Sequence, residues 1–138
     1  MMINDSKTFT DDQFVVASPE NRPFWVAAEK EQFIGKSCSD CGKFHWYPRT
    51  VCPFCRSDKT EWTPLSGNGE IYAYSVLRRA NPPYVVAYIK LDEGPIVLSN
   101  IVDTDENDLK IGLPVQVTFQ RTEDGRNSPK FKISKVTR

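Results

Sequence analysis

The chain has 138 residues, of which 39% are hydrophobic and 12% aromatic, with zero net charge at pH 7. This length fits one ordinary domain, or one domain joined to a small metal module. A dedicated nucleic-acid binder is usually strongly basic, so the balanced charge argues against that class. No stretch approaches the roughly 20 apolar residues that span a bilayer, which argues against a membrane protein.

The first twenty residues are mostly polar and show little periodicity. They predict a flexible tail, and they lack the apolar segment of a secretory signal peptide. Residues 21–31 predict a helix, because Asn21 is a suitable N-cap and Pro23 falls in the first turn. A helix this short is marginal alone and needs a surface on which to dock. A strand over residues 32–37 is expected to follow.

All four cysteines of the chain fall in two Cys-x-x-Cys turns ten residues apart: Cys38, Cys41, Cys52 and Cys55. This spacing can bring four thiolates to the corners of one tetrahedron, as in structural zinc sites. Gly42 supplies the positive φ that a tight turn needs, and Pro53 fixes φ at the start of the second turn. The pattern therefore predicts a rubredoxin-like zinc ribbon with a structural Zn²⁺.

Four cysteines in this pattern have three alternative uses. Two disulfides would suit a small secreted domain, but the missing signal peptide and free thiols favour a reducing cytoplasm. A redox pair needs one Cys-x-x-Cys turn at a strand–helix junction, not two turns. Iron uses the same ligands as zinc, and the sequence leaves that choice open. Four thiolates would carry a formal charge of −2 with a divalent metal, and nearby cations are expected to offset it: Lys36, Lys43, Arg49 and Arg56.

The rest of the chain, residues 64–138, predicts a barrel. Strand-like segments rich in β-branched and aromatic residues are separated by Gly, Pro and Asn: 69–79, 84–91, 96–102, 114–121 and 130–136. Five short strands in this space are typical of an OB-fold barrel. The expected fold is thus mainly β, with a tail over 1–20, a helix and zinc ribbon over 21–63, and an OB-fold barrel over 64–138.

Catalytic residues are harder to find. His45 is the only histidine, and it lies between aromatic residues inside the expected ribbon, where a packing role is more common than catalysis. The cysteines are committed to metal, and the carboxylate pair Asp92–Glu93 is followed by Gly-Pro and predicts a hairpin turn. The sequence therefore favours a binding or assembly subunit without activity of its own. A stand-alone binding module for CoA thioesters or single-stranded nucleic acid, or an independent enzyme, are the alternatives.

Several short motifs resemble a known family when their order is considered. They are Phe24-Trp25, Cys-x-x-Cys-Gly, Tyr-Pro-Arg at 47–49, Cys-Pro-x-Cys, Gly67-x-Gly69-x-Ile-Tyr and Pro82-Pro83-Tyr84. In this order the chain resembles, over roughly residues 22 to 134, the acyl-CoA-associated zinc-ribbon/OB-fold proteins. These are small accessory subunits of thiolase-like complexes, such as the small subunit of benzoylsuccinyl-CoA thiolase.

The resemblance implies that a thiolase-like partner carries the catalytic residues, while this chain helps to bind CoA or the acyl group and to assemble the complex. CoA offers phosphates and an adenine ring, which require cations and a stacking surface. The candidates are Arg49, Arg78, Arg79, Trp46 and Tyr84. Phe24 and Trp25 are the candidate docking residues, because aromatic anchors often dominate interfaces. Packing of both rings inside the chain is the alternative.

Overall fold

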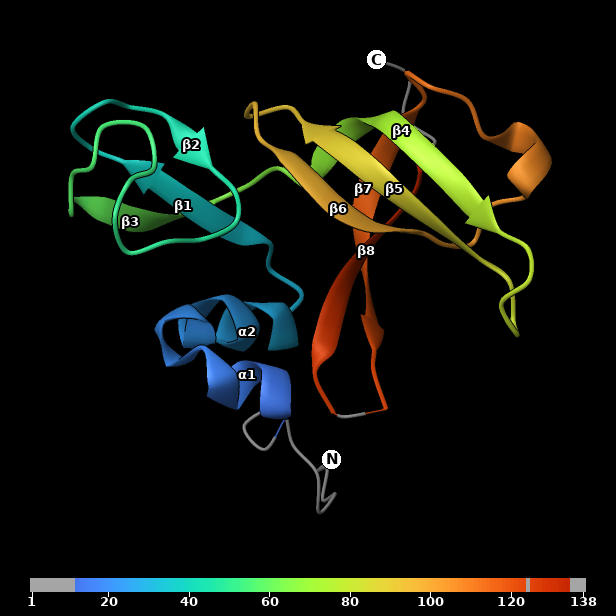
Figure 1. Ribbon diagram of the computed structural model, residues 1–138, viewed down its shortest axis with the longest axis horizontal. Coiled ribbons are helices and arrows are strands. Elements are labelled where there is room, and N and C mark those ends of the chain that lie inside the picture. The colour runs from blue at the N-terminus through green and yellow to red at the C-terminus, as the bar shows by residue number, and fades with distance from the viewer. Residues whose placement is uncertain (1–11, 124, 135–138) are drawn as a thin grey trace. The chain divides into compact units, whose positions relative to one another are not determined.

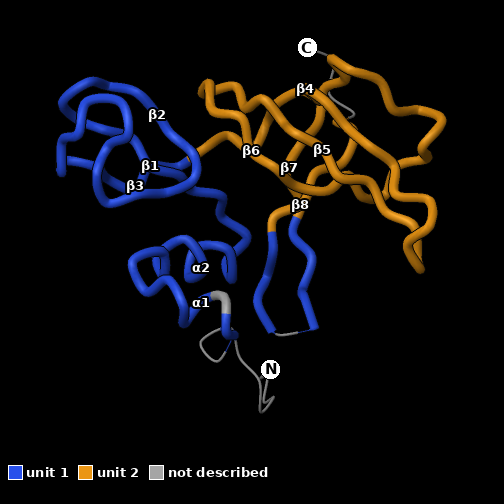
Figure 2. Tube along the Cα trace, in the orientation of Figure 1, with its two compact units in different colours: residues 1–64, 119–128 blue, residues 65–118, 129–138 orange. Residues whose placement is uncertain are grey.

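The computed structural model describes residues 12–123 and 125–134. These residues form two compact units, which Figure 2 shows in blue and orange. The first unit takes the described part of residues 1–64 together with the segment 119–128. The second takes residues 65–118 and the described part of 129–138. No helix in the described ranges has the length and hydropathy of a membrane-spanning segment.

The first unit combines short helices with a small sheet (Figure 1). The helical elements are α1 (Gln13–Ala17), the 3-10 turn η2 (Pro19–Asn21) and α2 (Arg22–Glu29). The sheet has the antiparallel order β2-β1-β3, with β1 at Ile34–Cys38, β2 at Phe44–His45 and β3 at Thr60–Pro64. The expected helix over 21–31 is therefore present and shorter by a few residues at its end.

Aromatic side chains form the core beside α2. Phe24 is 6% exposed, and its ring lies 4.9 Å from Trp25 and 5.6 Å from Trp46, measured between centroids. Phe33 packs against the same cluster. Asn21 occupies the N-cap position, but its side chain does not cap the helix and instead donates to the hydroxyl of Tyr47 at 3.2 Å. The helix is thus held by tertiary packing, as its length requires.

Five strands form a closed barrel, and most of their residues belong to the second unit. The strands are β4 (Asn68–Leu77), β5 (Tyr84–Leu91), β6 (Ile96–Ile101), β7 (Pro114–Arg121) and β8 (Asn127–Ile133), with the 3-10 turn η3 at Glu106–Asp108. The strand order β4-β5-β6-β8-β7 closes through an antiparallel pairing of β4 with β7. The pair β6–β8 is parallel, with Ile101 opposite Phe131. This is the OB-fold barrel that the sequence predicts.

Alternating side chains fill the barrel. Along β5, buried and exposed residues alternate, so that Val85, Ala87, Ile89 and Leu91 point inward. Phe131 from β8 is only 1% exposed. Gly69 lies where β4 enters the barrel, and a Cβ atom there would come within 2.5 Å of the Lys90 carbonyl oxygen. The glycine therefore permits the close backbone approach of β4 to β5.

The end of the β7–β8 hairpin clusters with the first unit, although the sequence predicts residues 64–138 as one barrel. Asn127 connects the hairpin to α2: its backbone N–H donates to Glu29 at 3.0 Å, and its side-chain amide donates to the Ala28 carbonyl at 2.7 Å. Arg121 also pairs with Glu29, at 3.0 Å. These contacts extend β8 to Asn127, three residues before the predicted start.

Residues 12–20 differ from the flexible tail that the sequence predicts, whereas residues 1–11 lie outside the described residues. Val15 of α1 is buried, and Asp12 is 2% exposed. The Asp12 carboxylate pairs with Arg126 of the hairpin at 2.7 Å. Arg126 also covers the Trp25 ring, with its guanidinium carbon 5.4 Å from the ring centroid. A buried ion pair thus holds this segment in place. Hydrophobic periodicity in the sequence does not indicate such a contact.

Replacing Asp12 with alanine is expected to lower the free energy of unfolding by about 2 kcal/mol, because the Arg126 charge then loses its buried partner. Urea denaturation followed by tryptophan fluorescence measures this change. The control is Glu106→Ala, which breaks the exposed pair with Arg78 and should cost about 0–1 kcal/mol. Equal free energies of unfolding in the two variants would show that the buried pair stabilises the fold no more than the exposed pair does.

Candidate metal centre

Two matching turns hold the four cysteines; each Cys-x-x-Cys turn with the two residues after it is called a knuckle. In the first, the Cys38 carbonyl accepts from Gly42 at 2.8 Å and the Cys38 N–H donates to Lys43 at 3.0 Å. In the second, Cys52 makes the same two backbone bonds, with Arg56 at 2.9 Å and Ser57 at 2.8 Å. The backbone therefore builds both halves of the cluster by one pattern.

The residue after each knuckle's second cysteine adopts a left-handed conformation. Gly42 has φ of 77°, as predicted for a tight turn, and Arg56 has φ of 67°. The sequence signals the first of these and not the second, because arginine rarely takes a positive φ. The knuckles are also tied to one another, since the Ser57 hydroxyl donates to the Asp40 carboxylate at 2.5 Å.

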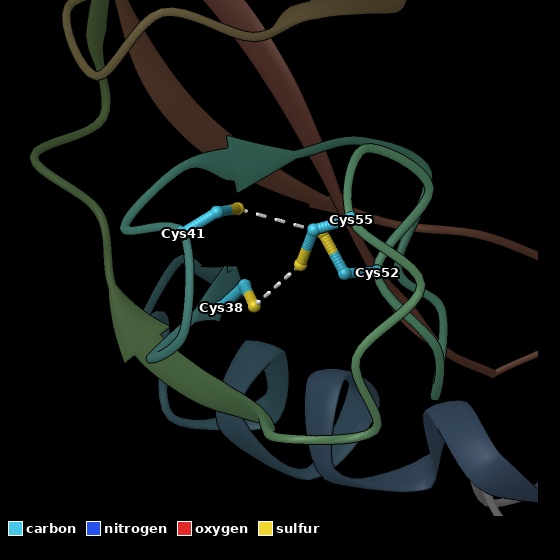
Figure 3. Close-up of side chains that lie close together, drawn as sticks. All are labelled: Cys38, Cys41, Cys52 and Cys55. Atoms are coloured by element: carbon cyan, nitrogen blue, oxygen red, sulfur yellow. Dashed lines mark hydrogen bonds between the residues drawn. The ribbon is translucent and has the colours of Figure 1, made fainter.

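The four sulfur atoms converge on one point (Figure 3). All of them lie within 4.8 Å of one another, with 3.6 Å between Cys38 and Cys55 and 3.7 Å between Cys41 and Cys52. A regular tetrahedron with Zn–S bonds of about 2.3 Å has edges of about 3.8 Å. All four cysteines are free thiols, so the two-disulfide alternative does not describe this structure. The donor set fits tetrahedral zinc.

The surroundings shift the pKa values of two of the cysteine thiols in opposite directions. Burial raises the pKa of the Cys52 thiol, but N–H groups of Cys55 and Phe54 donate to its sulfur and outweigh burial, so that the pKa is lowered to about 7. For Cys55, the Ser57 N–H lowers the pKa, but burial and the neighbouring cysteine sulfurs prevail and raise it to about 12. A metal binds thiolates, so its binding must release protons and strengthen as pH rises.

The chemistry of such a cluster is structural. Four thiolates fill every position of tetrahedral zinc and leave none for water or substrate. Zinc held by Cys38, Cys41, Cys52 and Cys55 would therefore join the two knuckles and stabilise the ribbon. Cys38 and Cys52 are buried, whereas Cys41 and Cys55 are exposed.

His45 lies in β2, opposite Lys36 of β1. It is 3% exposed, and its Nε2 accepts a hydrogen bond from the Arg49 N–H at 3.2 Å, so the proton of the neutral ring is on Nδ1. Burial lowers the pKa of His45, and the positive charges of Lys36 and Arg49 act in the same direction. The side chain thus positions the segment between the knuckles, in line with the packing role expected from the sequence.

The predicted CoA-binding residues fall in both units. Arg49 and Trp46 belong to the first, where Trp46 is half-buried against Phe24 and Phe33. In the second, Leu77 is opposite Tyr84, so Arg78 and Arg79 lie in the loop between β4 and β5. The structure therefore brings Arg78, Arg79 and Tyr84 to one hairpin end. Arg78 there pairs with Glu106 at 3.0 Å.

The two predicted docking residues have different surroundings. Phe24 is buried in the aromatic core of its own unit, which corresponds to the alternative of packing inside the chain. Trp25 is half-buried beneath Arg126. Helical spacing alone does not distinguish a core-facing ring from one that faces a partner.

Two family models match the chain in succession. The ChsH2 rubredoxin-like zinc ribbon domain matches residues 25–61, which contain all four cysteines. The ChsH2 C-terminal OB-fold domain matches residues 62–120. The two matches thus divide the chain into a zinc ribbon and an OB-fold domain, which are the two structural types that the fold contains.

Individual relatives agree with this division. A DUF35 domain-containing scaffold protein of Methanocaldococcus jannaschii is 41% identical over 106 residues, which are 70% of this chain and 74% of the relative. The benzoylsuccinyl-CoA thiolase subunit BbsA of Geobacter metallireducens is 30% identical over 57% of this chain and 58% of its own length. The solved structure of the Ltp2-ChsH2(DUF35) aldolase superimposes with a TM-score of 0.73 at 26% identity, over 82% of this chain and 93% of that one. The chain therefore belongs to the DUF35 family of zinc-ribbon and OB-fold proteins.

Proposed function

We propose that this protein is a non-catalytic, zinc-binding subunit of a thiolase-type complex that acts on acyl-CoA or β-ketoacyl-CoA thioesters. The observation that carries the proposal is the chain's likeness to a protein named as a subunit of a CoA thiolase, BbsA, together with its likeness to the Ltp2-ChsH2(DUF35) aldolase. In this proposal the chain binds a catalytic partner and helps to hold the CoA substrate.

The chemistry of the described residues supports this division of labour. The four thiols converge on the cluster, so a cysteine nucleophile is expected from the partner. His45 is buried, and its Nε2 accepts a hydrogen bond from the backbone N–H of Arg49. This nitrogen is therefore not presented to a substrate as a general base would be. Zinc would then serve the complex indirectly, by keeping a ribbon rigid that is too small for a large core of its own.

For the CoA contact, the loop between β4 and β5 is the preferred candidate. It presents Arg78 and Arg79 beside Tyr84, which is 48% exposed. A guanidinium and an aromatic face match the phosphate and adenine groups of CoA. Arg49 and Trp46 remain the second candidate pair, although Trp46 has part of its surface covered by Phe24 and Phe33.

The proposal is tested by activity with and without the partner. The chain is purified alone and as the complex that it forms in its source, and both are assayed for thiolytic cleavage of β-ketoacyl-CoA thioesters. Turnover is expected in the complex and not in the chain alone. Turnover by the isolated chain at the rate of the complex would contradict a non-catalytic role.

A stand-alone binding module is the second candidate, because four tyrosines of β4 and β5 are exposed: Tyr72, Tyr74, Tyr84 and Tyr88. Aromatic surfaces on OB-fold strands can stack on bases or on adenine. Affinity for oligonucleotides that falls steeply with salt would favour nucleic acid, whereas salt-tolerant binding of CoA by the isolated chain would favour a CoA module.

A further inference from the structure

Lys36 is a buried cation beside the cysteine cluster. Its residue is only 8% exposed, a degree of burial that lysine almost never reaches without a partner charge. Among the described residues, no Asp or Glu carboxylate pairs with its ammonium group. Its polar contact is the Thr60 hydroxyl at 3.3 Å, and its Nζ lies 4.7 Å from the centroid of the Trp62 ring. The described part of the chain thus provides no carboxylate partner for this charge.

The register of the small sheet shows which way the ammonium group points. Lys36 and Cys38 are two residues apart in β1, so they lie on the same face. Trp62 is opposite Lys36, and Thr60 is opposite Cys38. The Lys36 Nζ extends beyond Trp62, the residue opposite it in β3, and donates to the hydroxyl of Thr60, the residue opposite Cys38. The ammonium group is therefore directed toward the end of β1 that carries Cys38.

The hydrogen bonds continue into the second knuckle. The Thr60 hydroxyl donates to the Thr50 carbonyl at 3.0 Å, two residues before Cys52. One polar chain therefore joins Lys36 in β1, Thr60 in β3 and the segment that leads to Cys52. Such outer contacts commonly orient metal ligands and tune the metal that they hold.

The other cations near the cluster differ from Lys36. Lys43 is exposed, and its ammonium group lies over the Phe54 ring, with Nζ 5.1 Å from the ring centroid. Arg49 and Arg56 are also exposed. Solvent screens exposed charges strongly, so proximity in sequence does not make these four residues equivalent. Burial singles out Lys36.

We propose that the Lys36 ammonium is the buried counter-charge of the metal-loaded tetrathiolate cluster and increases its affinity for zinc. A divalent metal with four thiolates carries a net charge of −2, which is the anion missing from the surroundings of Lys36. The inference rests on the proposed metal binding at the cluster. The sequence predicts that four cations near the cluster offset its charge, whereas this proposal assigns the buried part of that role to Lys36.

The test compares the zinc affinity of Lys36→Met with that of the control Lys43→Met, by competition with a chelator. Lys36→Met should bind zinc about 10–100-fold more weakly than the wild type, and Lys43→Met should match the wild type. Lys36→Arg, which keeps the charge, should recover most of the affinity. Equal affinities of the wild type and Lys36→Met would overturn the proposal.

A second measurement separates charge from folding. The cluster is loaded with iron, whose reduction makes the tetrathiolate more negative, so a nearby cation favours the reduced form. Lys36→Met should therefore have a reduction potential lower by at least about 59 mV, equivalent to tenfold for one electron, with no such shift in Lys43→Met. An unchanged potential overturns the counter-charge. A wild type that binds neither zinc nor iron would instead overturn the metal site itself.

Discussion

Replacing Cys38 with serine is expected to abolish stoichiometric zinc binding and to unfold the ribbon formed by β1, β2 and β3. A serine hydroxyl does not supply the thiolate that the fourth corner of the tetrahedron requires. Structural zinc contributes about 10–16 kcal/mol to the folding of small metal modules, and its loss is therefore the largest single effect expected in this chain. Metal content per chain and near-ultraviolet circular dichroism measure the outcome.

The second cysteine pair provides an independent version of the same experiment. Cys55→Ser removes an exposed ligand from the other knuckle and should give the same loss of metal. Ser39→Ala is the matched control, because Ser39 follows Cys38 and its hydroxyl makes one exposed bond, to the Lys59 carbonyl. Unchanged metal content and thermal melting in both cysteine variants would contradict the metal site.

Replacing Phe131 with alanine is expected to destabilise the barrel by about 3–5 kcal/mol, since a large buried ring is lost and a cavity remains. Phe131 is 1% exposed, and its backbone carbonyl accepts a hydrogen bond from Val102 at 2.8 Å next to the parallel pairing of β6 with β8. Its side chain therefore fills the core where two strands distant in sequence meet. Urea unfolding followed by far-ultraviolet circular dichroism measures the loss.

The control for this variant is Tyr72→Ala, which removes an aromatic ring of similar size from the outer side of the same barrel. Tyr72 is 54% exposed, so the change should stay within about 0.5 kcal/mol. If both variants lost the same free energy, the core position of Phe131 would be wrong. If only Phe131→Ala aggregated during expression, a milder Phe131→Leu variant would still rank the two positions.

Patterns that are local in sequence made much of this fold predictable. The predicted strands at 84–91 and 114–121 coincide with β5 and β7, since each has Gly or Pro at a boundary and β5 alternates regularly. The cysteine spacing likewise predicted the cluster, because Cys-x-x-Cys turns build themselves from backbone bonds within six residues. The OB-fold topology followed from the number and length of the strands.

Features that depend on distant contacts were not predictable in the same way. β3, at Thr60–Pro64, has no buried alternation and forms by pairing with β1. α1 has five residues and depends on an ion pair between Asp12 and Arg126, 114 positions apart. Neither carries a periodic signal, so the sequence predicted no element there.

The same distinction between local patterns and distant contacts applies to the candidate site. Metal ligands could be predicted because one short segment contains all four. Docking and CoA residues depend on molecules outside this chain, and spacing does not reveal which face meets them. For Phe24, helical spacing fitted a core position as well as a docking position, and the structure shows the core. Burial of Lys36 likewise became visible only from the pairing of three strands.

Native mass spectrometry of the untagged protein, purified from its own source, tests most directly whether this chain is a zinc-bearing subunit of a thiolase-type complex. The expected result is a complex that contains a thiolase-sized partner and one zinc ion for each copy of this chain. Denaturing the same sample should identify that partner by its mass and peptides. A metal-bearing monomer without a partner would contradict the subunit role and leave a free binding module.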